Sequence, residues 1–430
     1  MKDNTKINGK KFKVGGAGAY FTLIVCSLLM AMNFMDRMVL SAVLEPMKID
    51  LGLSDTQVGL INTAFLLSIA FFSFPVSYLV DRWSRRKSLA IMAIIWSFFT
   101  FITGLGKSFI GVLIPRTMVG AGEAGFSAAG TAMITASFPA EKRSRVLGIF
   151  NMSVPIGMAL GVVLGGYIST NHGGWRAPFI VFAIPGIILG IIAFFLKDYK
   201  TIENLDNTGK REGIFVSTRK LLQIPTLRWL YLGYGFLQML TSVLIWVPAY
   251  LMRSHKISEA EAGIFMGGIA LMSILGAPIG GFLADLWQRK NKKGRMYLPA
   301  LSQFISAILL AGAFFCEFKG IGLLLGYAYG VIAVMSLPAL GAVSQDVVTP
   351  AIKGMSTGLT VVAMYFIGGW APYAVGGISD MLGGGVIGLK IALMIMSSGG
   401  ILAGICFWIG SRHYPSDMDK VKGITLEGER

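Results

Sequence analysis

Apolar stretches with few or no charges recur along the whole chain and are separated by shorter polar segments. Twelve of them are long enough for a helix to cross the hydrocarbon core of a bilayer, which takes about 20 apolar residues. They lie near residues 18–44, 56–80, 88–106, 109–137, 146–170, 176–196, 226–252, 258–284, 297–316, 320–345, 354–379 and 387–411. They are far longer than the strands of a membrane barrel and do not alternate apolar with polar residues, so the pattern predicts transmembrane helices.

Composition agrees with a chain that lies mostly in lipid. Of the 430 residues, 54% are hydrophobic and only 14% are charged, whereas charged residues make up about 25% of a soluble protein. We therefore predict an all-α membrane protein with twelve transmembrane helices. The sequence shows no phosphate-binding loop, no nucleophile paired with a base and no spacing typical of metal ligands, so we expect no enzyme, no metal and no cofactor.

The net charge of +16 suggests nucleic-acid binding at first sight, but its distribution along the chain argues against this. Lys and Arg concentrate in the two terminal tails and in alternate segments between the apolar stretches, such as 81–87, 197–225 and 285–296. This asymmetry follows the positive-inside rule, by which basic residues stay in the cytoplasm. We therefore expect both termini in the cytoplasm, contact with anionic lipid headgroups and no nucleic-acid partner.

The two halves of the chain repeat one another. The longest polar interruption divides the apolar stretches six and six, and SYLVDRWSRRK after the second stretch is echoed by GFLADLWQRK after the eighth. Asp81 and Asp285 are 204 positions apart, and so are Trp83 and Trp287. Two parallel repeats joined by a linker are a transporter architecture, in which the halves rock about a central site. The predicted segments are a cytoplasmic N-terminal tail at 1–17, a six-helix bundle at 18–197, a cytoplasmic linker at 198–225, a second six-helix bundle at 226–411 and a cytoplasmic C-terminal tail at 412–430.

These motifs resemble a known family. The two repeated segments are similar to the cytoplasmic signature of the major facilitator superfamily, and PIGMALGVVLGG (155–166) is similar to its glycine-rich fifth helix. The first copy departs from the signature at Ser77 and Ser84, where Gly is usual, and the second has Leu286 in place of Arg. The resemblance covers essentially the whole chain and implies two six-helix bundles that move a substrate by alternating access.

Within the superfamily, several segments resemble the bacterial Spinster-like branch. They include MDRMVLSAVLEPMKIDLGLSDTQVGLINTAF, RTMVGAGEAGFSAAGTAMITASFP and WVPAYLMRSHKISEAEAG. This resemblance implies an inner-membrane carrier of an amphipathic anionic or zwitterionic substrate such as a lysolipid. The anion:cation symporter family shares the Met-Asp-Arg motif and the Arg-to-Glu spacing of the fourth stretch. That alternative implies uptake of a small organic anion, such as a sugar acid or carboxylate, together with protons.

Four charged residues fall inside apolar stretches: Asp36 and Arg37 in the first, and Arg116 and Glu123 in the fourth. An ionisable group at membrane depth costs about 2.5–3.5 kcal/mol on insertion scales and is therefore a functional candidate. Arg116 and Glu123 are seven residues apart, about two helical turns, so they share one helix face. We predict that Asp36, Arg37 and Arg116 lie at similar depth in the outer half of the membrane, with Glu123 near the midplane. The alternative is a structural ion pair that only fixes the first helix against the fourth.

The resemblance to the two families implies roles for these side chains. Acids at the positions of Asp36 and Glu123 are associated with proton coupling, and arginines at the positions of Arg37 and Arg116 with substrate contacts or gating. The predicted substrate-binding residues are Arg37, Arg116, Asn33, Gln238, Tyr365 and Trp370. For Trp370, a place in the core or at the membrane interface is the alternative.

The second half of the chain carries no charge deep in its apolar stretches, where Met266, Met272, Tyr365 and Trp370 lie instead. We therefore hypothesise that the first half holds the charged head of a substrate and the proton, while the second half offers an apolar wall. This division suits an amphipathic molecule. We expect a monomer whose partners are this small-molecule or lipid-like substrate, protons and membrane lipids.

Another set of charges lies at the predicted cytoplasmic ends of the helices. Asp81, Arg82, Arg85 and Arg86 follow the second stretch, and Asp285 follows the eighth. On the strength of the family resemblance, we predict that they pair with neighbouring helix ends and latch one conformation, with Asp285 as the weaker partner. Simple anchoring by positive charge on the cytoplasmic side is the alternative, and it is part of their role in either case.

Overall fold

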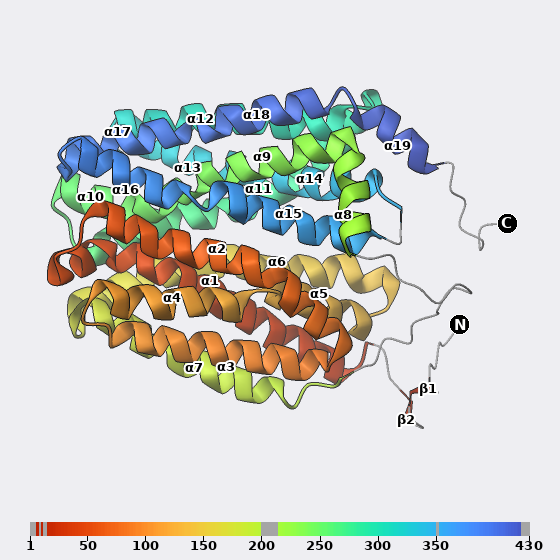
Figure 1. Ribbon diagram of the computed structural model, residues 1–430, viewed down its shortest axis with the longest axis horizontal. Helices are drawn as coiled ribbons and strands as arrows, with labels where there is room; N and C mark the ends of the chain where they lie inside the picture. Colours follow the sequence, from red (N-terminus) through yellow and green to blue (C-terminus); the bar gives the residue numbers. More distant parts are fainter. Residues whose placement is uncertain (1–5, 8–9, 12–14, 199–213, 350–351, 423–430) are drawn as a thin grey trace.

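The computed structural model describes residues 6–7, 10–11, 15–198, 214–349 and 352–422, and almost all of them are helical (Figure 1). The first half contains α1 (Ala17–Leu51), α2 (Asp55–Arg82), α3 (Arg85–Gly104), α4 (Phe109–Glu123), α5 (Phe126–Ser137), α6 (Ala140–Asn171), the 3-10 helix η1 (Gly174–Arg176) and α7 (Ala177–Ala193). The second contains α8 (Ile214–Gln223), α9 (Pro225–Ser242), the 3-10 helix η2 (Val243–Trp246), α10 (Val247–His255), α11 (Glu259–Lys290), α12 (Gly294–Phe315), α13 (Ile321–Val334), α14 (Ser336–Asp346), α15 (Lys353–Gly368), α16 (Ala371–Met381), α17 (Gly385–Ser397), α18 (Gly399–Gly410) and α19 (Tyr414–Lys422). A short antiparallel ladder of β1 (Lys6–Ile7) and β2 (Lys10–Lys11) precedes α1.

Eleven helical segments in the described part of the chain are long and apolar enough to cross a membrane. This confirms the expectation of an all-helical membrane protein, while the number of twelve spans stays a prediction. The predicted stretch 109–137 forms two shorter helices, α4 and α5, because the chain turns at Ala124 and Gly125. Gly125 has a φ of +88°, a left-handed conformation that glycine adopts without steric cost.

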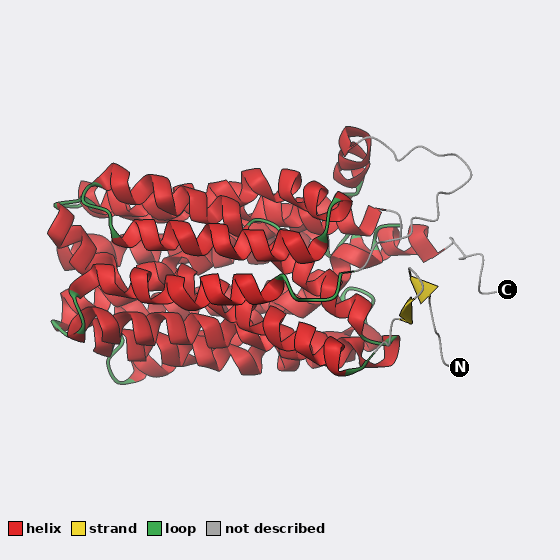
Figure 2. Ribbon diagram, turned by 90° about the horizontal axis from the view of Figure 1, so that it is seen from below, coloured by secondary structure: helices red, strands yellow, loops and turns green. Residues whose placement is uncertain are grey.

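The helices of the two halves of the chain form two neighbouring groups. In Figure 1, α1 to α7 lie below and α9 to α18 lie above, all running roughly along the long axis. The strands β1 and β2 and the helices α8 and α19 all lie at one end of the molecule in Figure 1, and Figure 2 shows the strands at the same end from another side. We call it the terminal end, and the opposite end, where α10 lies, the distal end. The predicted domain boundaries stay a prediction, and residues 199–213 of the predicted linker lie outside the described residues.

Helix α6 lies directly against α1. The glycines at 157, 161 and 165 face α1, and a Cβ atom added at Gly161 would lie only 2.6 Å from the backbone oxygen of Met35. Small residues at a helix interface let two backbones approach closely, which is how membrane helices gain packing contacts. The segment of α1 beside Asp36 is therefore fixed against α6.

The two halves meet through α2 against α15 and α16, α6 against α11, and α1 against α10. Backbones approach closely toward the distal end. A Cβ atom at Gly59, in the second turn of α2, would lie 2.2 Å from the Pro372 carbonyl oxygen of α16. A Cβ atom at Gly263, near the start of α11, would lie 2.5 Å from the Val162 oxygen of α6. The two halves are therefore closely packed, backbone against backbone, toward the distal end.

Candidate functional site

Asp36 and Arg37 lie near the middle of α1, and Asp36 is only 1% exposed. One carboxylate oxygen of Asp36, Oδ2, accepts a hydrogen bond from Thr100 Oγ1 of α3 at 3.2 Å. Arg116 of α4 is fully buried, and its Nη1 donates to the backbone oxygen of Asp36, also at 3.2 Å. Helices α3 and α4 thus enclose the acid of α1 from two directions.

The Arg37 guanidinium joins both halves of the protein. Its Nε donates to Glu123 Oε2 of α4 at 2.7 Å, and its Nη1 donates to the Tyr365 hydroxyl of α15 at 3.0 Å. The Arg37 side chain is 15% exposed, whereas that of Glu123 is completely buried. Asn33, one turn before Arg37 on α1, lies beside the Glu123 carboxylate. The structure thus brings together Asp36, Arg37, Arg116 and Glu123, which we call the central cluster.

The central cluster has hydrogen-bonding capacity that the protein does not use. Asp36 Oδ1, Glu123 Oε1, and both Nε and Nη2 of Arg116 are buried without a hydrogen-bond partner among the described residues. Buried polar atoms are normally paired, because an unpaired one in an apolar interior is costly. The arrangement can therefore accept a proton or a further polar group.

Two aromatic rings and a threonine support the central cluster, and none of the three was predicted as a site residue. The Arg37 guanidinium carbon lies 4.7 Å from the ring centre of Phe34 and 5.7 Å from that of Phe65. The Arg116 guanidinium carbon lies 4.9 Å from the same Phe65 ring. Only Phe34 could have been found from spacing, since it precedes Arg37 by three residues and so shares its helix face. Phe65 and Thr100 come from other helices.

The other predicted substrate-binding residues divide into two groups. Tyr365 and Asn33 lie at the central cluster, as described above. Gln238 instead donates to Ser242 Oγ at 3.1 Å and accepts from Thr241, all within its own helix. Trp370 lies between α15 and α16 and is 49% exposed. In the described part of the chain, no hydrogen bond joins Gln238 to the central cluster.

A second charged group, at the distal end, was not predicted. Asp55 at the start of α2 is fully buried and accepts from two nitrogens of Arg253 on α10, at 2.8 and 2.6 Å. It also accepts from Lys48 Nζ and from Ser379 Oγ of α16. Arg253 Nε donates in addition to Glu45 Oε2 of α1 at 2.8 Å. We call Glu45, Lys48, Asp55, Arg253 and Ser379 the distal network. It joins the two halves, since the first three belong to α1 and α2 and the last two to α10 and α16.

Further hydrogen bonds cross between the halves at or near this end. Asp380 of α16 accepts from the backbone N–H groups of Asp55 and Thr56, at 3.1 and 2.8 Å, and so caps the start of α2. Ser41 of α1 donates at 2.8 Å to the backbone oxygen of Ile245, in the short 3-10 segment η2 between α9 and α10. In the sequence, the charged residues of the distal network and Asp380 lie near predicted helix ends, where charged residues at the membrane interface are common. Their positions along the chain therefore did not predict that they pair with one another.

The latch predicted at the cytoplasmic helix ends stays a prediction. The side chains of Asp81 and Arg82 lie outside the described residues. Arg86 donates to the Leu196 backbone oxygen at 3.3 Å, and Arg85 begins α3. Asp285 accepts from Arg295 at 2.7 Å, and Arg295 also bonds to Asp346, so the contacts of Asp285 seen here stay within its own half.

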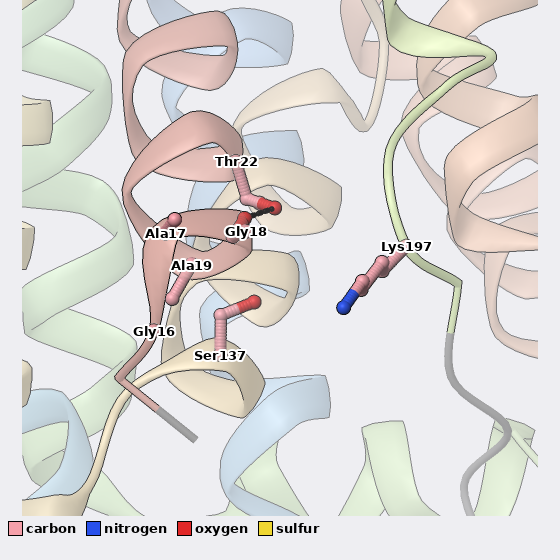
Figure 3. Close-up of a pocket in the computed structure, with 7 residues that line it drawn as sticks. All are labelled: Gly16, Ala17, Gly18, Ala19, Thr22, Ser137 and Lys197. Atoms are coloured by element: carbon pink, nitrogen blue, oxygen red, sulfur yellow. Dashed lines mark hydrogen bonds between the residues drawn. The ribbon is translucent and has the colours of Figure 1, made fainter. Parts of the chain in front are cut away.

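A pocket of about 310 Å³ lies at the terminal end, at the start of α1 (Figure 3). It is lined by Gly16, Ala17, Gly18, Ala19, Thr22, Ser137 and Lys197. The Thr22 and Ser137 hydroxyls donate to backbone oxygens of their own helices, at 2.9 and 2.8 Å. Thr22 precedes Asp36 by fourteen residues, about 20 Å along the helix, so this pocket is separate from the central cluster. Among the described residues, no group of three or more His, Cys, Asp or Glu side chains is placed to hold a metal ion.

Comparison with known proteins supports the interpretation that this protein is a transporter. This chain is 27% identical over 418 residues to protein spinster homolog 1 of Xenopus tropicalis, covering 89% of this chain and 78% of that protein. It is 27% identical to the hexuronate transporter of Bacillus subtilis (strain 168), covering 82% and 86%. It is 24% identical to an MFS-type efflux pump of Mycolicibacterium smegmatis, covering 94% and 95%. The resemblance to the Spinster-like branch noted in the sequence thus finds relatives.

Solved structures show the same fold. A bacterial homologue of the human lysosomal transporter Spinster, in an inward-facing and unoccupied conformation, matches with a TM-score of 0.81 and 24% identity over 94% of this chain and 99% of that one. A D-xylose–proton symporter matches with a TM-score of 0.71 and 18% identity over 90% and 97%. The sequence profile of the Major Facilitator Superfamily matches residues 26–372. The chain therefore belongs to the Major Facilitator Superfamily and is similar to its Spinster-like branch.

Proposed function

We propose that this protein is a proton-coupled secondary active transporter that works by alternating access and moves an amphipathic anionic or zwitterionic substrate such as a lysolipid. One observation carries the proposal. Arg37 is the most exposed member of an otherwise buried charge cluster, and it bonds to Glu123 in one half and Tyr365 in the other. A substrate that binds Arg37 therefore acts on an ion pair and on the contact between the halves at once.

The charges of the central cluster supply the coupling. Two acids and two arginines sum to zero when all are ionised, and a proton on Asp36 or Glu123 makes the cluster net positive. An anionic head that binds Arg37 competes with Glu123 for the guanidinium. A buried carboxylate that loses its partner is strongly destabilised in the charged form, so it takes up a proton. Substrate binding and proton uptake are thereby linked.

The contacts between the halves support alternating access. The distal network and the close backbone contacts of α2 with α16 hold the distal end together. We propose that in this state the substrate site faces the terminal end, in keeping with the similarity to an inward-facing structure. The opposite state then requires the distal network to break.

We further propose that the terminal end faces the cytoplasm and that the protein lies in the bacterial inner membrane as a monomer. The basic residues of both tails and of segments 81–87 and 285–296 support this orientation. Relatives in Bacillus subtilis and Mycolicibacterium smegmatis support a bacterial membrane.

The resemblance of the sequence to the Spinster-like branch implies the lysolipid class of substrate, and the Spinster homologues among the relatives support that branch. The proposed apolar wall does not include every residue expected from the sequence. Met266 is 1% exposed and packs in the core beside α6, so it lines no cavity in this conformation. Tyr365 is the residue of the second half that contacts Arg37 directly, and we propose that it borders the head of the substrate.

Uptake of a small organic anion is the second candidate. The similarity to a hexuronate transporter favours it, and the fold is shared with a D-xylose–proton symporter. In this case Arg37 holds the carboxylate of the substrate, and the coupling by Glu123 is the same. The two candidates differ only in what lies beyond the charged head.

Flux into proteoliposomes with an imposed pH gradient tests both candidates. The substrates are radiolabelled lysophosphatidylethanolamine and glucuronate, and the proteins are the wild type, Asp36→Asn and Glu123→Gln. We expect gradient-driven flux of the lysolipid in the wild type and its loss in both variants. Flux of glucuronate alone establishes the second candidate. Gradient-driven flux that persists with both acids neutralised would overturn the coupling role of the central cluster.

A further inference from the structure

We propose that Phe65 is a positioning residue for coupling: its ring holds the guanidinium groups of Arg37 and Arg116 in place and ties them to α2, the helix that packs on the other half. The inference rests on the proposed function, since it assigns a part in proton coupling to a residue without a titratable group.

Geometry carries the proposal. The guanidinium carbons of Arg37 and Arg116 lie 5.7 and 4.9 Å from the centre of the one Phe65 ring. Both distances are within the range of about 6 Å in which a cation is attracted to the face of an aromatic ring. Phe65 itself is 1% exposed, so water does not weaken the interaction. One buried ring is therefore shared by the two cations of the cluster.

The backbone is built to bring this ring close. A Cβ atom added at Gly120 of α4 would lie 2.4 Å from the Phe65 backbone oxygen and 3.0 Å from the Ser68 Cβ atom. Any larger residue at 120 would push α2 away from α4. Gly120 lies between Arg116 and Glu123 in the sequence, one turn after the arginine. The backbones of α2 and α4 thus approach closely at the level of the central cluster.

The same part of α2 faces the other half of the protein. A Cβ atom at Gly369 of the second half would lie 3.2 Å from the Leu66 Cβ atom, so the residue after Phe65 contacts the chain just beyond α15. Helix α15 also carries Tyr365, which accepts the hydrogen bond of Arg37. A movement of α15 against α2 therefore reaches the central cluster by two routes, through Tyr365 and through Phe65.

The Phe65 ring affects proton binding by Glu123 because it holds the guanidinium groups of Arg37 and Arg116 in place. The ionisable groups around it are Asp36 and Arg37 on α1, Arg116 and Glu123 on α4, and Tyr365 on α15. With the ring present, Arg37 stays against Glu123 at 2.7 Å. Without it, the guanidinium loses an attractive surface and is freer to leave the carboxylate. Glu123 then binds a proton more readily.

Infrared spectroscopy of the full-length protein in lipid nanodiscs tests this without any substrate. The carbonyl band of protonated buried carboxyl groups is followed against pH, with Asp36→Asn and Glu123→Gln to assign it. For Phe65→Leu we expect the midpoint of the Glu123 band to rise by about one pH unit, a tenfold change in proton affinity. The matched control is Phe71→Leu, because Phe71 lies on the same helix but is 73% exposed. We expect the wild-type midpoint there.

A second variant separates the charge attraction from simple packing. Incorporation of 3,4,5-trifluorophenylalanine at position 65 keeps the shape of the ring but removes the negative potential of its face. We expect a shift in the same direction as for Phe65→Leu, and wild-type titration for Phe65→Tyr. The fluorinated protein also decides the question if Phe65→Leu does not fold.

Each outcome has a separate meaning. Wild-type midpoints in both Phe65→Leu and the fluorinated protein would overturn the role of Phe65 and leave the proposed function intact. Absence of a gradient-driven flux in the wild type would overturn the proposed function, whereas the titration shift would still establish that the ring positions the arginines.

Discussion

The central cluster and the distal network each contain charged residues of α1 and of other helices. They differ in how completely the hydrogen-bonding atoms of these charged groups are paired. In the distal network, Asp55 accepts hydrogen bonds from Arg253, Lys48 and Ser379. No buried side-chain atom of this network lacks a partner among the described residues. In the central cluster, Asp36, Arg116 and Glu123 each keep at least one unpaired buried atom.

This difference indicates different tasks. A buried ion pair offsets the cost of removing charge from water only when its remaining donors and acceptors are also bonded. The distal network meets that condition and so is suited to hold two surfaces together. The central cluster does not meet it, and its free energy therefore falls when a proton or a polar ligand arrives. We therefore propose that the distal network locks a conformation and that the central cluster responds to a proton or a ligand.

The largest effect is expected from Glu123→Gln in the central cluster. The variant leaves the largely buried Arg37 without its anionic partner, and breaking a buried pair costs about 3–5 kcal/mol, a factor of about 100 or more in an equilibrium. We expect gradient-driven flux in proteoliposomes to fall by about that factor. Glu141→Gln is the control, since Glu141 lies exposed in the first turn of α6. Equal losses in both variants would mean that the unpaired atoms of the cluster have no special role.

The next effect is expected from Arg253→Gln in the distal network. Among the described residues, Asp55 is then left with Lys48 as its only cationic partner. We expect the free energy of the closed distal end to rise by about 3 kcal/mol relative to that of the open one. A cysteine placed at Thr63, which accepts from the Tyr373 N–H between the halves, reports the opening through its reaction with a membrane-impermeant maleimide. We expect labelling to become about 100-fold faster.

The control for this measurement is Arg176→Gln. Arg176 also forms an ion pair at the distal end, with Asp50 at 2.7 Å, but both partners belong to the first half. Its loss should leave the labelling rate unchanged. If Arg253→Gln also leaves it unchanged, the distal network is not a lock between the halves.

A smaller effect is expected from Asp380→Ala. The side chain caps the start of α2 from the other half, and loss of a helix cap costs about 1 kcal/mol, or about fivefold in an equilibrium. We expect labelling of the Thr63 cysteine to accelerate by about this factor. Ser54→Ala is the matched comparison, because Ser54 bonds to the Gln57 N–H of the same helix end from within the first half. It should destabilise α2 without opening the distal end.

The smallest effect is expected from Lys292→Ala at the terminal end. Lys292 pairs with Asp419 at 3.6 Å, but the two side chains are 68% and 51% exposed. Exposed pairs contribute about 0–1 kcal/mol, since water screens them. We expect neither flux nor labelling to change measurably. A large change in either would show that the division between satisfied and unsatisfied buried charges does not decide function.

Much of the architecture follows from sequence alone because the bilayer is a demanding solvent. A helix is needed wherever the backbone crosses lipid, so apolar length predicts the spans directly. The same physics marks Asp36, Arg37, Arg116 and Glu123 as exceptional. The seven-residue spacing of the last two indicated a shared face, and the structure brings all four together. The interruption between α4 and α5 at Gly125 was not predicted, because a continuous apolar stretch does not show where its helix is interrupted.

The tertiary structure alone decided which neighbours complete these charges. Phe65, Thr100 and Tyr365 come from three other helices, and side-chain chemistry by itself does not tell which of many aromatic or hydroxyl residues faces a charge. The distal network is a stronger case. Asp55 and Arg253 are separated by 198 positions and each resembles an ordinary charge at a helix end. They become a buried pair only because α2 and α10 meet, and that meeting is set by packing between the halves, which leaves no periodic trace in the sequence.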